Sequence, residues 1–356
     1  MDEIYRRLRE KLDQVPIGFP EGKGAIEILK NLFTPEEAEL ALKLPMITKS
    51  LEEIAAELNE DPATLREKLD GMASRGTVLA IEKEGKKLYR LLPSVVGFWE
   101  TPFWPGRRDE RTQKLAPLWR KYFEEKFAHE VGDRKQIIFR VIPVDIAISP
   151  KSMITPFEDV LELLKPLNYF AVAHCPCRQI AAFTGDGCNH SLEVCLHFDS
   201  MGEYMVKHGL AREITREETI KILRKSNEEG LVHMTDNHQG KITTICNCCG
   251  CCCIFFRMLK EMNLPRAVAK SNYVSRVDTE LCAACGTCAE RCPMQAIKVD
   301  DFAVVNEEKC VGCGVCYPTC PQKAIALVRK PEDKIVEIPD RKTYINNLLK
   351  EKGLIP

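Results

Sequence analysis

The spacing of apolar and polar residues in the N-terminal third predicts two closely spaced helices. The first helix begins at Thr34 and Pro35, because a capping side chain followed by proline is typical of a first helical turn. The second covers Leu51–Leu58, where Ser50 and Glu53 have the spacing of a capping box. Both helices are therefore expected from local signals alone.

A third helix and a hairpin follow. Asp61 before Pro62 starts a helix that covers Ala63–Ser74. Strands are predicted over Thr77–Glu82 and Lys87–Leu92, because a short turn with glycine separates the two apolar runs. Helix, turn, helix and hairpin is the order found in helix-turn-helix proteins that read DNA, so a winged-helix-like domain is expected here.

Charge argues against nucleic acid as the partner of this domain. The whole chain carries 51 Lys+Arg against 52 Asp+Glu. Between residues 34 and 92 acidic residues outnumber basic ones, so the surface lacks the excess of cations that supplies most DNA affinity. Docking of a protein, or a structural role, is the preferred interpretation of this domain.

An aromatic segment over residues 98–127 contains all three tryptophans of the chain. Such a segment is typical of core or interdomain packing, and a partner-binding surface is the alternative. Its members are Phe98, Trp99, Phe103, Trp104, Trp119, Tyr122, Phe123 and Phe127.

Eight of the 18 cysteines form a duplicated pattern near the C-terminus. Each copy reads C-x-x-C-x-x-C-x-x-x-C-P, the spacing of bacterial iron–sulfur proteins. Zinc or a disulfide framework is the alternative, but zinc sites favour paired C-x-x-C units with a longer spacer. The two copies are Cys282, Cys285, Cys288 and Cys292 before Pro293, and Cys310, Cys313, Cys316 and Cys320 before Pro321.

Residues 278–328 resemble the bacterial two-[4Fe–4S] ferredoxin domain. The resemblance implies that the fourth cysteine of each copy binds the cluster of the other copy. One cluster would then be held by Cys282, Cys285, Cys288 and Cys320, and the other by Cys310, Cys313, Cys316 and Cys292.

Four further cysteines in the middle of the chain are candidates for a third [4Fe–4S] cluster. They are Cys175, Cys177, Cys188 and Cys195, and structural zinc on the same residues is the alternative. A strand is predicted over Asn168–Ala173, which places the first two thiols on the loop that leaves it. Arg178 would neutralise the negative charge of such a cluster. His174, His190 and His197 are candidates to donate hydrogen bonds to its sulfurs.

The run from Cys246 to Cys253 contains six more thiols and indicates a fourth cluster. It lies between a predicted strand, Lys241–Ile245, and a predicted apolar helix, Ile254–Met262, whose N-terminus favours an anionic group. Other members of the run would bridge to the site at Cys175 or be buried as small hydrophobes. The candidate ligands are Cys246, Cys248, Cys249 and either Cys252 or Cys253.

Residues 135–328 as a whole resemble a group of multi-cluster iron–sulfur proteins of anaerobes. The resemblance implies an electron carrier with three to four [4Fe–4S] clusters and a partner oxidoreductase. Alternatives are a redox enzyme whose substrate binds the cluster at Cys246–Cys253, and a redox sensor that binds DNA through the winged helix. Motifs for flavin, NAD or haem are not found.

We expect an α+β protein of the reducing cytoplasm. The chain starts with a charged helix rather than a signal peptide, and its longest apolar stretch is too short for a transmembrane segment. In a reducing compartment cysteines bind metals more often than they form disulfides. The expected parts are a helical arm (1–33), the winged-helix-like domain (34–95), a cysteine-rich mixed α/β domain with an aromatic linker (96–270), the ferredoxin-like dicluster domain (271–330) and a tail (331–356).

Overall fold

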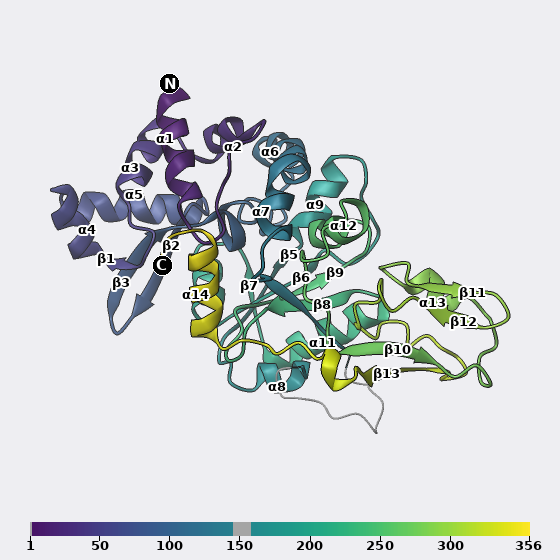
Figure 1. Cartoon of the computed structure of the whole chain (residues 1–356). Helices are drawn as coiled ribbons and strands as arrows, with labels where there is room; N and C mark the ends of the chain where they lie inside the picture. The colour runs from purple at the N-terminus through teal and green to yellow at the C-terminus, as the bar shows by residue number, and fades with distance from the viewer. Residues whose placement is uncertain (1, 145–157) are drawn as a thin grey trace.

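The N-terminal part of the protein is a group of helices beside a small sheet (Figure 1). The computed structural model describes residues 2–144 and 158–356. The strands of the small sheet have the order β1-β3-β2 and are antiparallel. The elements are α1 (Asp2–Asp13), α2 (Ala25–Leu32), α3 (Pro35–Lys43), β1 (Lys49–Ser50), α4 (Leu51–Leu58), α5 (Pro62–Ser74), β2 (Val78–Lys83) and β3 (Lys86–Leu91).

The three predicted helices and the hairpin are confirmed. Thr34 and Ser50 both cap their helices through complete capping boxes, which satisfy backbone N–H groups that the first helical turn leaves without partners. The hairpin turns at Glu84 and Gly85, which both have positive φ, as a tight two-residue turn requires. The assignment to the winged-helix class stays a prediction.

A six-stranded antiparallel sheet forms the centre of the protein, with the order β4-β8-β9-β6-β5-β7. Leu196 and Ile245 on one of its faces pack under α8 and α11. The strands are β4 (Phe139–Ile142), β5 (Phe170–His174), β6 (Glu193–Phe198), β7 (Arg212–Ile214), β8 (Val232–Asp236) and β9 (Thr244–Cys248). The helices around it are α8 (Val160–Leu164), α9 (Pro176–Phe183), α10 (Asp199–Lys207), α11 (Arg216–Glu228) and α12 (Ile254–Glu261).

The aromatic segment is core, as the preferred interpretation expected. All eight of its aromatic side chains are buried. Trp99 and Phe123 meet edge to face with their ring centroids 4.7 Å apart. A partner-binding surface is therefore excluded for these rings. The segment is built on η1 (Ser94–Phe98), α6 (Glu110–Tyr122), η2 (Phe123–Phe127) and α7 (Ala128–Gly132).

A small module with two pairs of antiparallel strands extends from the end of the molecule opposite α4 (Figure 1). Strands β10 and β13 pair along five residues, so the beginning and the end of the module lie side by side. Its elements are β10 (Tyr273–Val277), α13 (Thr287–Arg291), β11 (Ile297–Val299), β12 (Ala303–Val305) and β13 (Ile325–Arg329).

The C-terminal tail contains a docked helix that the sequence analysis did not predict. A short turn, η4 (Glu332–Lys334), precedes α14 (Arg341–Glu351). Lys352 Nζ lies 3.0 Å from a carboxylate oxygen of both Asp13 and Glu130. The largest buried apolar cluster therefore extends from the first helix to Leu348. Among the described residues, none of the helices has the length and apolar character that crossing a bilayer requires.

Candidate metal centres

All 18 cysteines of the chain are free thiols, and they gather into four groups. Two groups lie in the C-terminal module and two in the central part of the protein. The first two are Cys282, Cys285, Cys288 and Cys320, and Cys292, Cys310, Cys313 and Cys316. The others are a set of six, Cys175, Cys177, Cys195, Cys246, Cys248 and Cys253, and a set of four, Cys188, Cys249, Cys251 and Cys252.

The two groups of the C-terminal module are the crossed sets that the ferredoxin resemblance implied. Cys320 joins the first copy of the motif and Cys292 joins the second. The two crossing thiols have matching surroundings: the Ala296 N–H donates to Cys292 Sγ at 3.3 Å, and the Ala324 N–H donates to Cys320 Sγ at 3.2 Å. Backbone donors stabilise thiolates, so these residues fit a cluster with four thiolate ligands in each pocket.

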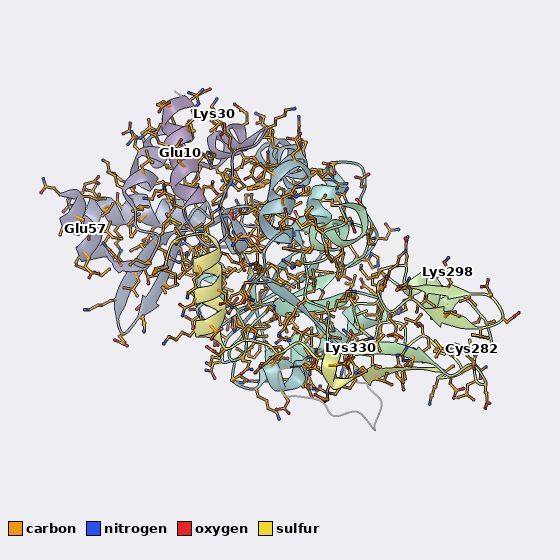
Figure 2. All side chains as sticks on the ribbon, in the orientation of Figure 1. Glu10, Lys30, Glu57, Cys282, Lys298 and Lys330 are labelled. Atoms are coloured by element: carbon orange, nitrogen blue, oxygen red, sulfur yellow. The ribbon has the colours of Figure 1, made fainter. Side chains whose placement is uncertain are left out.

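The two pockets differ in their access to solvent. Cys285 in the first pocket is exposed, and the labelled Cys282 lies far from the central sheet (Figure 2). In the second pocket Cys313 and Cys316 are buried. Burial raises the pKa of the Cys313 thiol well above its ordinary value. The first pocket is thus the outer one and the second the inner one.

The set of six cysteines lines a chamber against the central sheet. Side chains two residues apart on a strand share a face, so Thr244, Cys246 and Cys248 of β9 all point into the chamber. Cys195 and His197 of the neighbouring strand β6 do the same. Cys175, Cys177 and Cys253 come from the N-terminal ends of α9 and α12.

The six thiols form a continuous series of neighbours. Each thiol interacts directly with the next, in the order Cys195, Cys246, Cys248, Cys253, Cys177 and Cys175. The chamber has a volume of about 50 Å³, compared with about 20 Å³ for each pocket of the C-terminal module. It is therefore larger and richer in thiols than a site for a single cube requires.

The walls of the chamber include several aromatic side chains. Trp99, Trp104 and Phe255 contribute apolar surface, and the buried side chains of Glu100 and His197 are the ionisable groups beside the thiols. Burial raises the pKa of Glu100 well above its usual range and lowers the pKa of His197 to about 4. Burial thus disfavours the charged form of both side chains.

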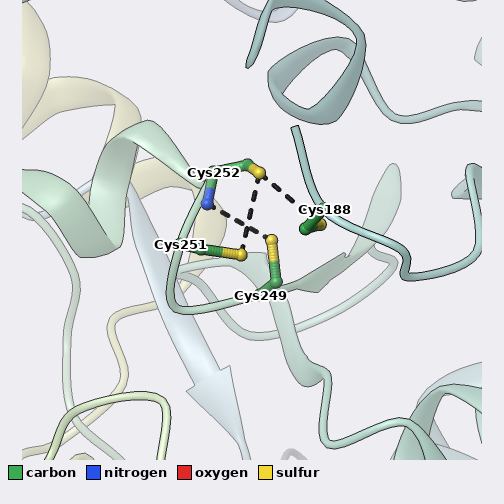
Figure 3. A group of neighbouring side chains, drawn as sticks. All are labelled: Cys188, Cys249, Cys251 and Cys252. Carbon is green, nitrogen blue, oxygen red and sulfur yellow. Dashed lines mark hydrogen bonds between the residues drawn. The ribbon is translucent and has the colours of Figure 1, made fainter. Parts of the chain in front are cut away.

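The fourth group is tighter than the others. The Cys252 Sγ atom lies 3.5 Å from Cys188 Sγ and 3.7 Å from Cys251 Sγ, and the backbone N–H of Cys252 donates to Cys249 Sγ at 3.4 Å (Figure 3). All four sulfurs lie within 4.8 Å of one another.

These groups differ from the sets expected from sequence. Cys188 was placed with Cys175, Cys177 and Cys195, but its thiol lies in the fourth group. Cys248 and Cys249 were placed in one cluster, but the side chains of adjacent residues at a strand end point to opposite sides, so the two thiols belong to different groups. The predicted strand was also too early: β9 contains Cys246 and Cys248 instead of ending before them.

Arg178 lies close to thiols of both central groups. Its buried guanidinium donates to the backbone oxygens of Ser191 and Asn247, both at 2.6 Å. The Cys175 and Cys249 thiolates hold its pKa above the ordinary arginine value despite burial. Within residues 2–144 and 158–356, the buried Arg178 Nε has no hydrogen-bond partner, so a further acceptor such as a sulfur fits there.

The three candidate histidines have different surroundings. His197 Nε2 lies 3.2 Å from Cys195 Sγ, and His190 Nδ1 lies 3.2 Å from Cys188 Sγ. His174 Nδ1 instead lies 3.3 Å from the backbone oxygen of Trp104. His190 and His197 are thus placed to contact ligand sulfurs, whereas His174 contacts backbone.

Two residues of the central groups were missed from sequence. Cys251 was left out of the candidate ligands, although the crowded Cys246–Cys253 run was the signal that could have included it. Glu100 lines the chamber from the aromatic segment. No local pattern links a glutamate at position 100 to thiols more than seventy residues later.

Direct backbone contact joins the C-terminal module to the central groups. Gly250 packs so closely on Pro293 that a Cβ atom at position 250 would lie 2.4 Å from the Pro293 oxygen. Arg291 adds a polar link, because its guanidinium donates to backbone oxygens of Val315 in the module and of Glu228 in α11. The inner pocket is therefore fixed against the loop that carries the fourth group.

Comparisons with known proteins identify the C-terminal module. Residues 275–327 match the model of the 4Fe-4S dicluster domain, which agrees with the crossed cysteine sets. Searches of curated proteins and of solved structures found no match to the chain. The C-terminal module is therefore a 4Fe-4S dicluster domain, and the cysteine-rich centre beside it indicates iron–sulfur electron transfer.

Proposed function

We propose that this protein is an electron carrier that transfers single electrons between a partner oxidoreductase and its own buried cysteine chamber. The observation that carries the proposal is the contact between Gly250 and Pro293. Pro293 follows Cys292, a ligand of the inner pocket, and Gly250 lies between cysteines of the central loop. An iron–sulfur cluster supplies reversible one-electron storage when it is bound.

The exposure of the residues suggests the order of the sites along the electron path. The outer pocket presents the exposed Cys285, the inner pocket contains the buried Cys313 and Cys316, and the six-cysteine chamber is lined mostly by buried side chains. Arg291 holds the inner pocket on α11, and the Val144 N–H donates to the Cys313 oxygen at 2.9 Å. These links fix the separation of the sites, and electron tunnelling depends steeply on that separation.

The partner protein is proposed to dock at the outer pocket. Three large apolar side chains beside it are exposed: Leu281 at 54%, Phe302 at 41% and Val304 at 53%. Exposed apolar groups around a redox centre are typical of a protein contact surface. We place this exchange in the reducing cytoplasm of an anaerobe, because free thiols and exposed iron–sulfur clusters are sensitive to oxidation.

Anaerobic EPR during a dithionite titration tests the proposal. The wild-type protein should show the signals of the two dicluster centres and at least one further reducible centre. Cys246→Ser should remove the further signal and leave the dicluster signals in place. Cys285→Ser should remove the signal of the outer dicluster centre and leave the inner dicluster signal and the further signal in place. Protein with iron and sulfide but no reducible centre would contradict electron transfer.

A catalytic role of the chamber is the second candidate function. The chamber offers six thiols, whereas a cube needs four thiolates, and it also holds the buried acid Glu100. A buried site with surplus ligands is a setting for a reacting small molecule. Turnover by the isolated chain with an artificial donor, lost in Cys248→Ser, would support it. A requirement for a second polypeptide in every assay would favour the carrier.

A DNA-binding redox sensor is the least supported function. On α5, Lys68 pairs with Glu60 at 2.8 Å, and Arg66 lies 3.8 Å from Asp70. These acids compete with phosphates for the same cations. We propose a protein-docking or structural role for the N-terminal domain. Gel-shift assays should show only weak, salt-sensitive association with duplex DNA.

A further inference from the structure

The fourth cysteine group has the dimensions of a site for one metal ion. With metal–sulfur bonds of about 2.3 Å, the sulfurs of a tetrahedral site lie about 3.8 Å apart. The measured separations, 3.5 Å from Cys252 to Cys188 and 3.7 Å from Cys252 to Cys251, agree with that value. A cube places four irons and four sulfides between its thiolates, so its ligands must stand farther apart.

We propose that Cys188, Cys249, Cys251 and Cys252 bind a single tetrahedral divalent ion, Zn²⁺ or Fe²⁺, rather than a [4Fe–4S] cluster. Four thiolates in a closed tetrahedron are the ligand set that both ions prefer. This proposal goes beyond the electron-carrier function, because the metal bound by this group can be determined whether or not the cubes carry electrons.

The dicluster pockets supply an internal comparison. Their cysteines all lie within residues 275–327, which match the 4Fe-4S dicluster domain. Among the described residues, neither pocket brings three thiols within the 4.8 Å limit that all four sulfurs of the fourth group satisfy. The same structure thus separates wide cysteine sets, which fit cubes, from one narrow set.

The surroundings of the group fit an anionic metal–thiolate centre. The Cys252 N–H donates to Cys249 Sγ, and His190 Nδ1 lies 3.2 Å from Cys188 Sγ. The Arg178 guanidinium contacts the Cys249 thiol from the buried side. Four thiolates around a divalent ion leave net negative charge, which a buried cation next to one ligand offsets.

The ion would fasten two distant segments. Cys188 follows α9, and Cys249 to Cys252 follow β9, so the ion would link two segments that are far apart in the sequence. The same loop holds Gly250 against Pro293 and presents Cys253 to the chamber. The free energy of metal binding adds to the stability of the folded state, because the unfolded chain lacks the assembled site. The ion would therefore stabilise the contact of Gly250 with Pro293 and the position of Cys253 in the chamber.

Metal analysis of anaerobically purified full-length protein tests the proposal, with Cys188→Ser compared with Cys195→Ser. Cys188→Ser should lose about one metal ion per chain with acid-labile sulfide unchanged. Cys195→Ser, the matched control in the chamber, should lose iron and sulfide together. Zinc and iron counts distinguish the two ions. Cobalt added to metal-depleted wild type should give the spectrum of a tetrahedral thiolate site, absent in Cys188→Ser.

Two outcomes would overturn the proposal. Loss of about four irons with an equal amount of sulfide in Cys188→Ser would show a cube at this site. No change in any metal would show that the four thiols bind none. Should Cys188→Ser not fold, Cys251→Ser supplies the same test, because that side chain is exposed and its loss leaves the core intact. The dicluster EPR signals, which test the proposed function, should persist in either variant.

Discussion

Gly250→Ala should separate the dicluster domain from the central cysteine loop. The new methyl carbon would lie 2.4 Å from the Pro293 oxygen and 2.8 Å from its Cα atom, and both are backbone atoms that cannot rotate away. Ordinary contacts need about 3.5 Å, so the two segments must move apart by about 1 Å. Overpacking of this kind costs about 1–3 kcal/mol of unfolding free energy.

The matched control is Gly71→Ala, which adds the same methyl group in open space on α5. Denaturant unfolding should show lower stability for Gly250→Ala and no loss for the control, since alanine favours a helix. In anaerobic stopped-flow reduction, the dicluster centres of Gly250→Ala should be reduced at the normal rate, and the chamber more slowly. If both variants matched wild type in stability and in chamber reduction, the contact would not hold the sites together.

Three further predictions follow from named contacts. Cys320→Ser should remove the same EPR signal as Cys282→Ser, and Cys292→Ser should remove the other dicluster signal. If Cys292→Ser instead removed the same signal as Cys282→Ser, the crossed ligand sets would be refuted. Arg291→Gln should lower the free energy of unfolding by about 1–3 kcal/mol, because its charge-assisted hydrogen bonds to Val315 and Glu228 are lost. Proteolysis between the module and α11 should become faster, and an unchanged rate would contradict this link. Ser50→Ala should cost about 1 kcal/mol through its lost helix cap, with redox signals unchanged, and Ser50→Asp should restore it.

Features that depend only on neighbouring residues could be predicted from the amino-acid sequence. The capping boxes at Thr34 and Ser50 and the turn at Glu84 and Gly85 are local hydrogen-bond and dihedral requirements, so three or four residues specify them. The cysteine spacing of the dicluster domain is also local within each loop. Its crossed fourth ligands came from the family resemblance and not from the spacing.

The division of the central cysteines into two groups depends on long-range packing and could not be predicted from local patterns. Cys248 and Cys249 are adjacent in sequence, but strand geometry turns their side chains to opposite sides. Cys188 meets Cys252 because packing of α9 near the end of β9 brings together segments that the sequence separates by 64 positions. The same long-range packing placed Glu100 in the chamber and α14 against the first helix. Such contacts depend on the summed burial of many side chains, which no short pattern encodes.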